Sequence, residues 1–252
     1  AILLLALLSL EYLLLLTLFL TPLSLQLSYL TGSTGFDLSL PTEPVMAFLL
    51  LTVLFRLTVT RGFPKELLRH PMTWMAGLYL LWTFITALTS TMPGVSFKTL
   101  AYRLWFTAGF YLVTARLAFV ERFRKRYILA YAAGLAVVVI YFIIRVQGAG
   151  LLNQQFAHSA CYPFYKDHTS FGASMAFIIP PLTVMLFSRG SLWHRGFLAT
   201  LLLIFVAGFV LSYSRAAWVS LIAASALSLI LWTRMPVKLL SLSALLFVIV
   251  LA

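Results

Sequence analysis

The sequence predicts an all-α protein that is embedded in a membrane. Of the 252 residues, 62% are hydrophobic and only 10% are charged, whereas soluble domains average about 45–50% and about 25%. The mean hydropathy is +1.02. Apolar runs of the length that a helix needs to cross a bilayer, about 20 residues, recur along the whole chain. These observations exclude the soluble enzyme folds.

Nine transmembrane spans are predicted, in this order. The apolar runs lie at about 4–23, 43–60, 72–90, 98–118, 127–146, 171–188, 197–213, 216–232 and 239–252. Polar or turn-forming segments separate them, except between the seventh and eighth runs, where Ser214 and Arg215 form the connection. We expect residues 1–252 to form a single transmembrane helical domain. Because the last run is cut short, we also expect an outer loop and further spans after residue 252.

The distribution of Lys and Arg predicts the orientation of the spans. Positive charge accumulates in the cytoplasmic loops of membrane proteins. Most of the 18 basic residues lie in alternate connections between the spans or at the adjoining span ends. These connections are the segments near 61–71, 119–126, 189–196 and 233–238. The basic residues there are Arg56, Arg61, Lys65, Arg69, Arg116, Arg122, Arg124, Lys125, Arg126, Arg189, Arg195, Arg234 and Lys238. We therefore expect a cytoplasmic N-terminus. The net charge of +12 reflects this topology and does not indicate nucleic-acid binding.

The other five cations fall at or near the outer face: Lys98, Arg103, Arg145, Lys166 and Arg215. Arg215 is the clearest case, because it occupies a tight turn between two spans. A charge costs about 2.5–3.5 kcal/mol near the centre of a membrane and less near its edge, so it usually has a partner. Guanidinium groups bind phosphate with two parallel hydrogen bonds. We predict a cationic cleft for an anionic ligand. The alternative is that each side chain extends to a lipid headgroup.

A polar segment before the sixth span is a second candidate anion site. Thr169 or Ser170 is expected to cap that helix, and a helix N-terminus attracts anions. Lys166 adds a donor, and His168 is predicted to act as a general base or a phosphate donor. An ordinary capped helix with solvated charges is the alternative. His158 lies in the same loop without a supporting pattern.

The acidic residues predict one ion pair and argue against a metal site. Glu11 in the first span and Arg56 in the second are expected to pair. The outer acids, Asp37, Glu43 and Asp167, are too few and too scattered for a divalent cation. The sequence contains no glycine-rich nucleotide-binding loop. We therefore expect no cofactor and no metal, and a substrate that is already activated.

Two segments resemble the bacterial O-antigen ligase and O-antigen polymerase superfamily. Leu-Ser-Tyr-Ser-Arg-Ala-Ala-Trp at 211–218 is similar to the family's Ser-Arg-Gly-Ala-Trp stretch, with Ala216 where the family often has Gly. Tyr-Lys-Asp-His-Thr-Ser-Phe-Gly at 165–172 resembles the segment that opens a mid-chain span of the family. Thr-Pro-Leu-Ser at 21–24 and Pro-Thr-Glu-Pro at 41–44 are similar to its first-loop borders.

This resemblance implies a fold and a reaction. Members are polytopic and resemble the class C integral-membrane glycosyltransferases. They work on the periplasmic face of the bacterial inner membrane and take a glycan from an undecaprenyl-pyrophosphate carrier. Ligases transfer it to the lipid A core, and polymerases transfer it to another lipid-linked glycan. The family also has a large periplasmic loop with a catalytic histidine, which would lie after residue 252.

The sequence thus predicts a metal-independent glycosyltransferase of lipopolysaccharide biosynthesis, with O-antigen ligation as the leading reaction. Arg215 and His168 are the predicted catalytic residues. The predicted pyrophosphate contacts are Arg103, Arg145, Lys166 and Lys98. The alternatives are an O-antigen polymerase, a transporter or flippase of an anionic lipid-linked substrate, and a structural membrane anchor. The transporter alternative is associated with broken spans, and Pro180–Pro181 is predicted to break the sixth.

Overall fold

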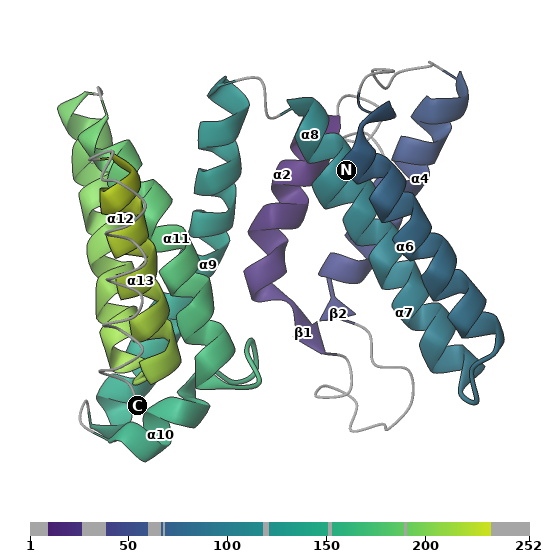
Figure 1. Ribbon diagram of the computed structural model, residues 1–252. Helices are drawn as coiled ribbons and strands as arrows, with labels where there is room; N and C mark the ends of the chain where they lie inside the picture. The colour runs from purple at the N-terminus through teal and green to yellow at the C-terminus, as the bar shows by residue number, and fades with distance from the viewer. Residues whose placement is uncertain are drawn as a thin grey trace. The chain divides into compact units, whose positions relative to one another are not determined.

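The structure, a computed structural model, describes residues 10–26, 39–59, 67, 69–117, 121–150, 153–188 and 191–232, and most of these are helical (Figure 1). The α-helices are α2 (Leu10–Leu20), α4 (Thr42–Val59), α6 (Pro71–Leu88), α7 (Pro93–Phe106), α8 (Thr114–Leu117), α9 (Glu121–Ala149), α10 (Gln154–Ala160), α11 (His168–Phe187), α12 (Leu192–Leu211) and α13 (Arg215–Trp232). A 3₁₀ turn, η1 (Thr21–Leu23), follows α2, and a π-helical segment, η2 (Thr107–Val113), joins α7 to α8. The predicted all-α class is confirmed.

Strand structure in the described residues is limited to one small antiparallel pair. The strand β1 (Leu25–Gln26) pairs with β2 (Ser39–Leu40), so that Leu25 lies opposite Leu40. The pair lies between α2 and α4 in the sequence, at the borders of the first predicted outer segment.

Four of the described helices are long and apolar enough to cross a membrane. They are Pro71–Leu88, Phe123–Ala149, His168–Phe187 and Leu192–Leu211. This supports the conclusion from composition that the protein is membrane-embedded. The predicted count of nine spans exceeds what these helices support. The ninth predicted span, 239–252, lies outside the described residues.

Polar residues and helix length explain why the other predicted spans fall short. Helices form at the first, second, fourth and eighth predicted spans, but the apolar helices at Leu10–Leu23, Thr42–Phe55 and Arg215–Ser228 are shorter. The helix α7 carries Lys98 and Arg103 and then gives way to the π-helical η2. A run of apolar letters therefore predicted a helix more reliably than it predicted a span.

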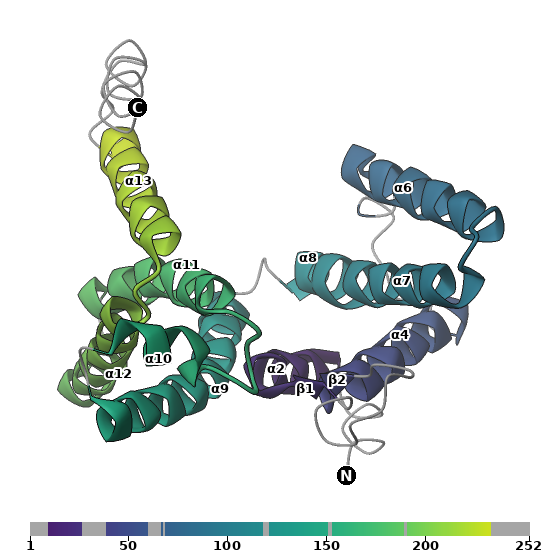
Figure 2. The same ribbon diagram turned by 90° about the horizontal axis from the view of Figure 1, so that it is seen from below.

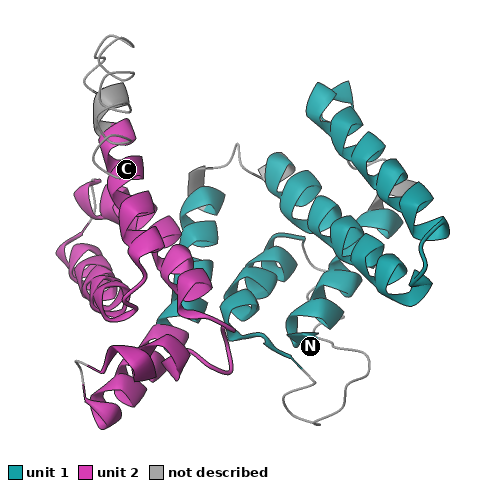
Figure 3. Cartoon of the chain, turned by 60° about the horizontal axis from the view of Figure 1, so that its bottom comes forward, with its two compact units in different colours: residues 1–137 teal, residues 138–252 magenta. Residues whose placement is uncertain are grey.

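The chain divides into two compact units, residues 1–137 and 138–252, which Figure 3 shows in different colours. In the first unit, α6 packs along α7, and α4 packs against both α2 and α7. Leucines and valines from α2, α4 and η2 fill its core, among them the fully buried Leu13, Leu49 and Val113. Helix packing through such apolar stripes holds the unit together.

Two glycines allow close helix contacts in the first unit. A Cβ on Gly109 would lie 2.6 Å from Leu49 Cδ2. A Cβ on Gly134 would clash with the carbonyl oxygen of Phe19, so no larger residue fits there without movement of the backbone. The backbone of α2 therefore lies directly against α9.

The predicted partner of Glu11, Arg56, lies outside the residues whose side chains the structure describes, so that pair stays a prediction. Glu11 accepts a hydrogen bond at Oε1 from Arg126 Nη1 of α9, at 2.9 Å. Both side chains are about one-third exposed, at 34% for Arg126 and 30% for Glu11.

In the second unit, α11 packs against both α12 and α13 (Figure 1 and Figure 2). Its core contains the fully buried Phe142, Phe171, Met175, Leu198 and Phe205. The predicted break at Pro180–Pro181 does not occur, since α11 continues through both prolines to Phe187.

Candidate functional site

The segment at 211–218 forms a tight turn between α12 and α13. The hydroxyls of Ser212 and Ser214 are buried and organise it. Ser212 Oγ donates to the carbonyl of Phe209 at 2.7 Å, and Ser214 Oγ accepts from the Ala217 amide at 3.4 Å. Between the two serines, Tyr213 has a φ of 50°, a conformation that few residues other than glycine adopt. The Trp218 indole donates to the same Phe209 carbonyl at 3.3 Å.

These contacts fix where Arg215 begins α13. Ser214 caps the helix, because its side-chain oxygen receives an amide from the first turn. Arg215 is the first helical residue and is exposed. It has no hydrogen-bond or ion-pair partner among the residues that the structure describes. The turn thus presents a free guanidinium group next to a helix N-terminus.

The segment at 165–172 packs against this turn through Gly172. A Cβ at this position would lie 2.9 Å from Ser214 Cβ and 3.0 Å from Ala217 Cβ. Only glycine allows α11 to lie this close to the start of α13. The two segments that carry the family resemblance are therefore in direct contact, although about 40 residues separate them.

Asp167, rather than Thr169 or Ser170, caps α11, so the predicted cap is corrected. Asp167 Oδ1 accepts from the Ser170 amide at 2.8 Å, and Oδ2 accepts from the Ser170 hydroxyl at 2.7 Å. These bonds, the amide first, hold the pKa of Asp167 below its usual value because they favour the carboxylate. The neighbouring Lys166 is exposed.

His168, the first residue of α11, stacks on His158 of α10. The two ring centroids are 3.8 Å apart and the ring planes differ by 10°. The Nε2 atom of His158 is buried and has no hydrogen-bond partner in the described structure. No local pattern singled out His158, because nine intervening residues and a change of helix separate it from His168.

Arg145, at the end of α9, holds the loop that carries these histidines. Its Nη1 donates to the carbonyl of Tyr162 at 2.8 Å, to that of Ala160 at 3.3 Å and to the Tyr141 hydroxyl at 3.2 Å. The guanidinium also lies over the Phe156 ring, 5.6 Å from its centroid. This arrangement gives Arg145 a structural role. Its predicted contact with pyrophosphate remains a prediction.

Lys98 and Arg103 belong to the first unit. The Lys98 ammonium lies 5.5 Å from the centre of the Tyr102 ring. Tyr102 in turn donates its hydroxyl to the buried Glu43, which also accepts the Ser39 amide at 2.6 Å. The Arg103 guanidinium lies 4.6 Å from the centre of the Tyr79 ring.

The predicted set of cations is thus divided between the two units. Arg145, Lys166, His168 and Arg215 are in the second unit, and their convergence with the first pair remains a prediction.

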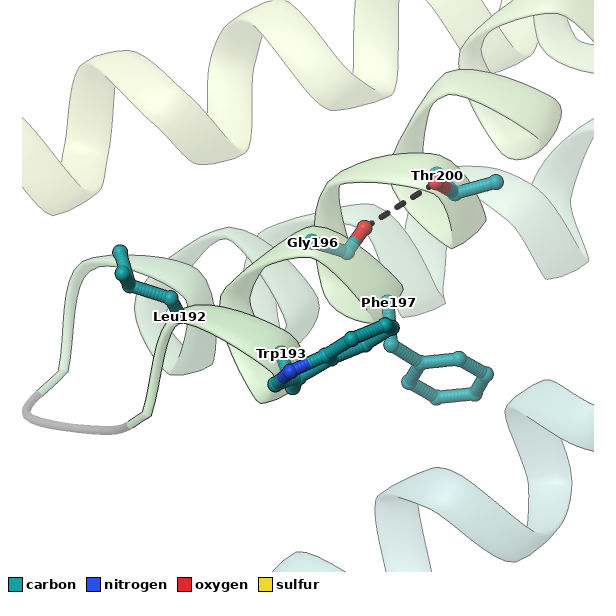
Figure 4. A pocket seen from close by; sticks show the side chains of 5 residues that line it. All are labelled: Leu192, Trp193, Gly196, Phe197 and Thr200. Atoms are coloured by element: carbon teal, nitrogen blue, oxygen red, sulfur yellow. Dashed lines mark hydrogen bonds between the residues drawn. The ribbon is translucent and has the colours of Figure 1, made fainter.

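A hollow on α12 does not belong to this site. It has a volume of about 540 Å³ and is lined by Leu192, Trp193, Gly196, Phe197 and Thr200 (Figure 4). All five come from the N-terminal half of one helix, whereas the turn at 211–218 begins at the other end of that helix. Among these five residues, Figure 4 marks one hydrogen bond, which Thr200 Oγ1 donates to the Gly196 carbonyl of the same helix at 3.0 Å. Trp193 is 91% exposed. An apolar surface of this kind on a candidate span is typical of contact with lipid.

Within the described part of the chain, no three His, Cys, Asp or Glu side chains come together in a way that could hold a metal ion. Metal independence remains a prediction from the sequence. Comparison with known proteins found no matching family model, no matching curated protein and no matching solved structure.

Proposed function

We propose that this chain is a glycosyltransferase of the bacterial inner membrane. It moves a glycan from an undecaprenyl-pyrophosphate carrier to an acceptor on the periplasmic face, and the leading reaction is O-antigen ligation to the lipid A core in lipopolysaccharide biosynthesis. The nine-span topology with a cytoplasmic N-terminus is part of this proposal. The observation that supports it is the contact of Gly172 with Ser214, which joins the two family-like segments beside the exposed Arg215.

In the proposed reaction, the acceptor hydroxyl attacks the anomeric carbon of the donor sugar. A new glycosidic bond forms as the bond from that carbon to the pyrophosphate oxygen breaks. Arg215 stabilises the negative charge that grows on the departing pyrophosphate, an electrostatic role for which a fixed donor is effective. His168 is the candidate within the described residues for the base that accepts the hydroxyl proton. Lys166 adds positive charge at the same helix start.

The uninterrupted α11 argues against the transporter alternative. That alternative is associated with spans broken at matched positions, and the one break expected from the sequence, at Pro180–Pro181, is absent. The polymerase alternative differs from ligation only in its acceptor. Assays with the lipid A core and with a second lipid-linked glycan as acceptors would distinguish the two reactions. Transfer is expected to persist in EDTA, and loss of activity that one metal restores would contradict metal independence.

The test of the proposal is the substitution Arg215→Lys, with Arg69→Lys as the matched control. Lysine keeps the charge but loses the planar pair of donors. A donor that acts on the transition state is worth about 2.7–4 kcal/mol, so transfer is expected to fall by about a hundredfold to a thousandfold at about 1.36 kcal/mol per tenfold. Arg69 is exposed and precedes α6, at the predicted inner face. Equal transfer by the two variants at matched membrane levels would reject the role of Arg215.

A further inference from the structure

A polar pocket lies between α6 and α7, wholly inside the first unit. Its volume is about 340 Å³, within the range of about 300–1,000 Å³ that is typical of small-molecule sites. Its lining is Tyr79, Trp82, Thr83, Thr86, Ala87, Ser96, Thr99 and Arg103. Apart from Arg103, these residues come from the halves of α6 and α7 that are nearest to the turn between the two helices (Figure 1).

Arg103 supplies the pocket with positive charge and hydrogen-bond donors. Its guanidinium is fixed by the Tyr79 ring, at 4.6 Å from the ring centre. Its Nε atom is buried and has no hydrogen-bond partner among the described residues. A buried donor without a partner is costly, most of all on a charged group. A bound anion would satisfy it, and phosphate matches the geometry of guanidinium.

The threonine hydroxyls supply acceptors. Thr83 donates its proton to the carbonyl of Tyr79 at 2.8 Å, Thr86 to that of Trp82 at 3.1 Å, and Thr99 to that of Val95 at 3.0 Å. A hydroxyl has one proton and two acceptor lone pairs. Because each proton is already used within its own helix, these three oxygens are available to accept hydrogen bonds from a ligand.

The pocket therefore pairs donors for one anion with acceptors for several hydroxyls. Around it, α6 exposes large apolar side chains: Leu78 at 63%, Leu81 at 54% and Trp82 at 67%. Since α6 is a candidate span, these side chains provide a surface for an acyl or polyprenyl chain. From this donor and acceptor pattern, we infer that the pocket binds the headgroup of a lipid that combines one phosphate with free hydroxyls. Phosphoglycerol lipids and lipid-linked sugar phosphates share this chemistry. The inference does not rest on the proposed transfer reaction.

The test is a titration of the purified full chain in detergent, followed by native mass spectrometry. The probes are phosphatidylglycerol, phosphatidylethanol and a polyprenyl phosphomannose. Phosphatidylethanol has the same phosphodiester charge as phosphatidylglycerol but no free hydroxyl. A neutral hydrogen bond contributes about 0.5–1.5 kcal/mol, so two of them should favour phosphatidylglycerol by about tenfold. Equal binding of these two lipids to the unmodified chain would overturn the inference without the need for any variant.

Variants locate the binding in the pocket. Arg103→Gln should weaken phosphatidylglycerol binding by about tenfold or more, since a hydrogen bond to a charged group is lost. Arg195→Gln removes one exposed cation from α12 and should change nothing. Thr86→Val combined with Thr99→Val should lower the affinity for phosphatidylglycerol to that for phosphatidylethanol. Wild-type affinity in Arg103→Gln would reject the site.

The third probe distinguishes the two sources of the headgroup. Tighter binding of the polyprenyl phosphomannose would identify a lipid-linked sugar as the ligand, and equal or weaker binding would identify the bilayer phospholipid. Failure of the lipid site appears as equal binding of phosphatidylglycerol and phosphatidylethanol, whereas failure of the proposed transfer reaction appears as equal transfer by Arg215→Lys and Arg69→Lys. The two failures therefore give different results.

Discussion

Gly172 of α11 lies in direct contact with Ser214, the residue that caps α13. A methyl group at position 172 would come within 2.9 Å of Ser214 Cβ. The contact places the cap of α13, which immediately precedes the exposed Arg215, against Gly172, four residues after His168 on α11. The position of the candidate catalytic arginine thus depends on the absence of a side chain on another helix.

Gly172→Ala should destabilise the second unit. The added methyl group must displace Ser214 or Ala217, and overpacking of this kind costs about 1–3 kcal/mol. We expect a lower midpoint of thermal unfolding in detergent, together with reduced transfer. Gly77→Ala is the control, because no atom lies within 4 Å of a Cβ at that position of α6. Alanine favours helices over glycine by about 0.8–1.0 kcal/mol, so the control should be neutral or stabilising. A tolerated Gly172→Ala with normal transfer would show that this contact does not position Arg215.

Asp167→Ala should loosen the first turn of α11. Loss of an N-cap costs about 0.5–2 kcal/mol, while Asp167→Asn should retain most of the cap. Hydrogen exchange of the amides at 168–172 measures the effect. In the unmodified chain, hydrogen bonds from Ser170 hold the folded pKa of Asp167 below its ordinary value of 3.8. The carboxylate therefore stabilises the cap fully above that pH, and the contribution is lost as the pH falls through the folded pKa. Weaker protection of these amides at neutral pH than at a pH below the folded pKa, after correction for the intrinsic pH dependence of exchange, would contradict this assignment.

The sequence predicted the helices better than their contacts. Apolar length alone located the long described helices, because helix formation at these places follows hydrophobic runs. The short helix α10 (Gln154–Ala160) was missed, since it lies in a segment that was expected to be an outer loop. Apolar length also placed the helix start near residue 168. The cap was missed, although Asp167 followed three residues later by Ser170 is a recognisable capping pattern. Whether an apolar run crosses the membrane depends on interior polar residues such as Arg103 and on helix irregularities such as η2. A count of apolar residues takes neither into account.

The candidate site was predicted as residues but not as an arrangement. Arg215 and His168 were selected from charge placement and from the two family-like segments. The stacking of His158 on His168 and the anchoring of the loop by Arg145 depend on how α9, α10 and α11 meet. No local pattern reports such contacts between helices. One residue type in the sequence could have indicated the contact between the two family-like segments. Gly172 ends the second segment, and it is the residue that contacts Ser214.

Reversing the Glu11–Arg126 pair should test whether this ion pair stabilises the contact between α2 and α9. Hydrogen bonds to charged groups are worth about 1.5–3 kcal/mol, and partial exposure lowers this toward the value for surface pairs, up to about 1 kcal/mol. Glu11→Arg alone should reduce the yield of folded protein and its unfolding midpoint, because it places two cations together. The double variant Glu11→Arg with Arg126→Glu should recover much of both. If Arg126→Glu gives no recovery, the contact between α2 and α9 is not stabilised by this pair.

Thiol labelling tests the orientation on which the proposed function depends. The native Cys161 serves as an internal negative control for labelling. It is fully buried, and burial raises the pKa of its thiol to about 11. Since the thiolate is the reactive form, roughly one thiol in a thousand is reactive at pH 8. Cys161 should therefore remain unlabelled in the unmodified chain until the protein is denatured, although it lies in a predicted outer loop.

Three introduced cysteines then show which side of the membrane each position faces. Gly94→Cys in the first unit and Ser159→Cys in the second are exposed at predicted outer positions, and Ser191→Cys is exposed at a predicted inner one. Only the first two should react with a membrane-impermeant maleimide in sealed cells, because positive charge retains the loop around Ser191 in the cytoplasm. Ser191→Cys should react once the membrane is permeabilised, which controls for its accessibility. The reverse pattern would place Arg215 and His168 at the cytoplasmic face. They would then lie on the opposite side of the membrane from a periplasmic donor, and the proposed transfer reaction would have to be abandoned.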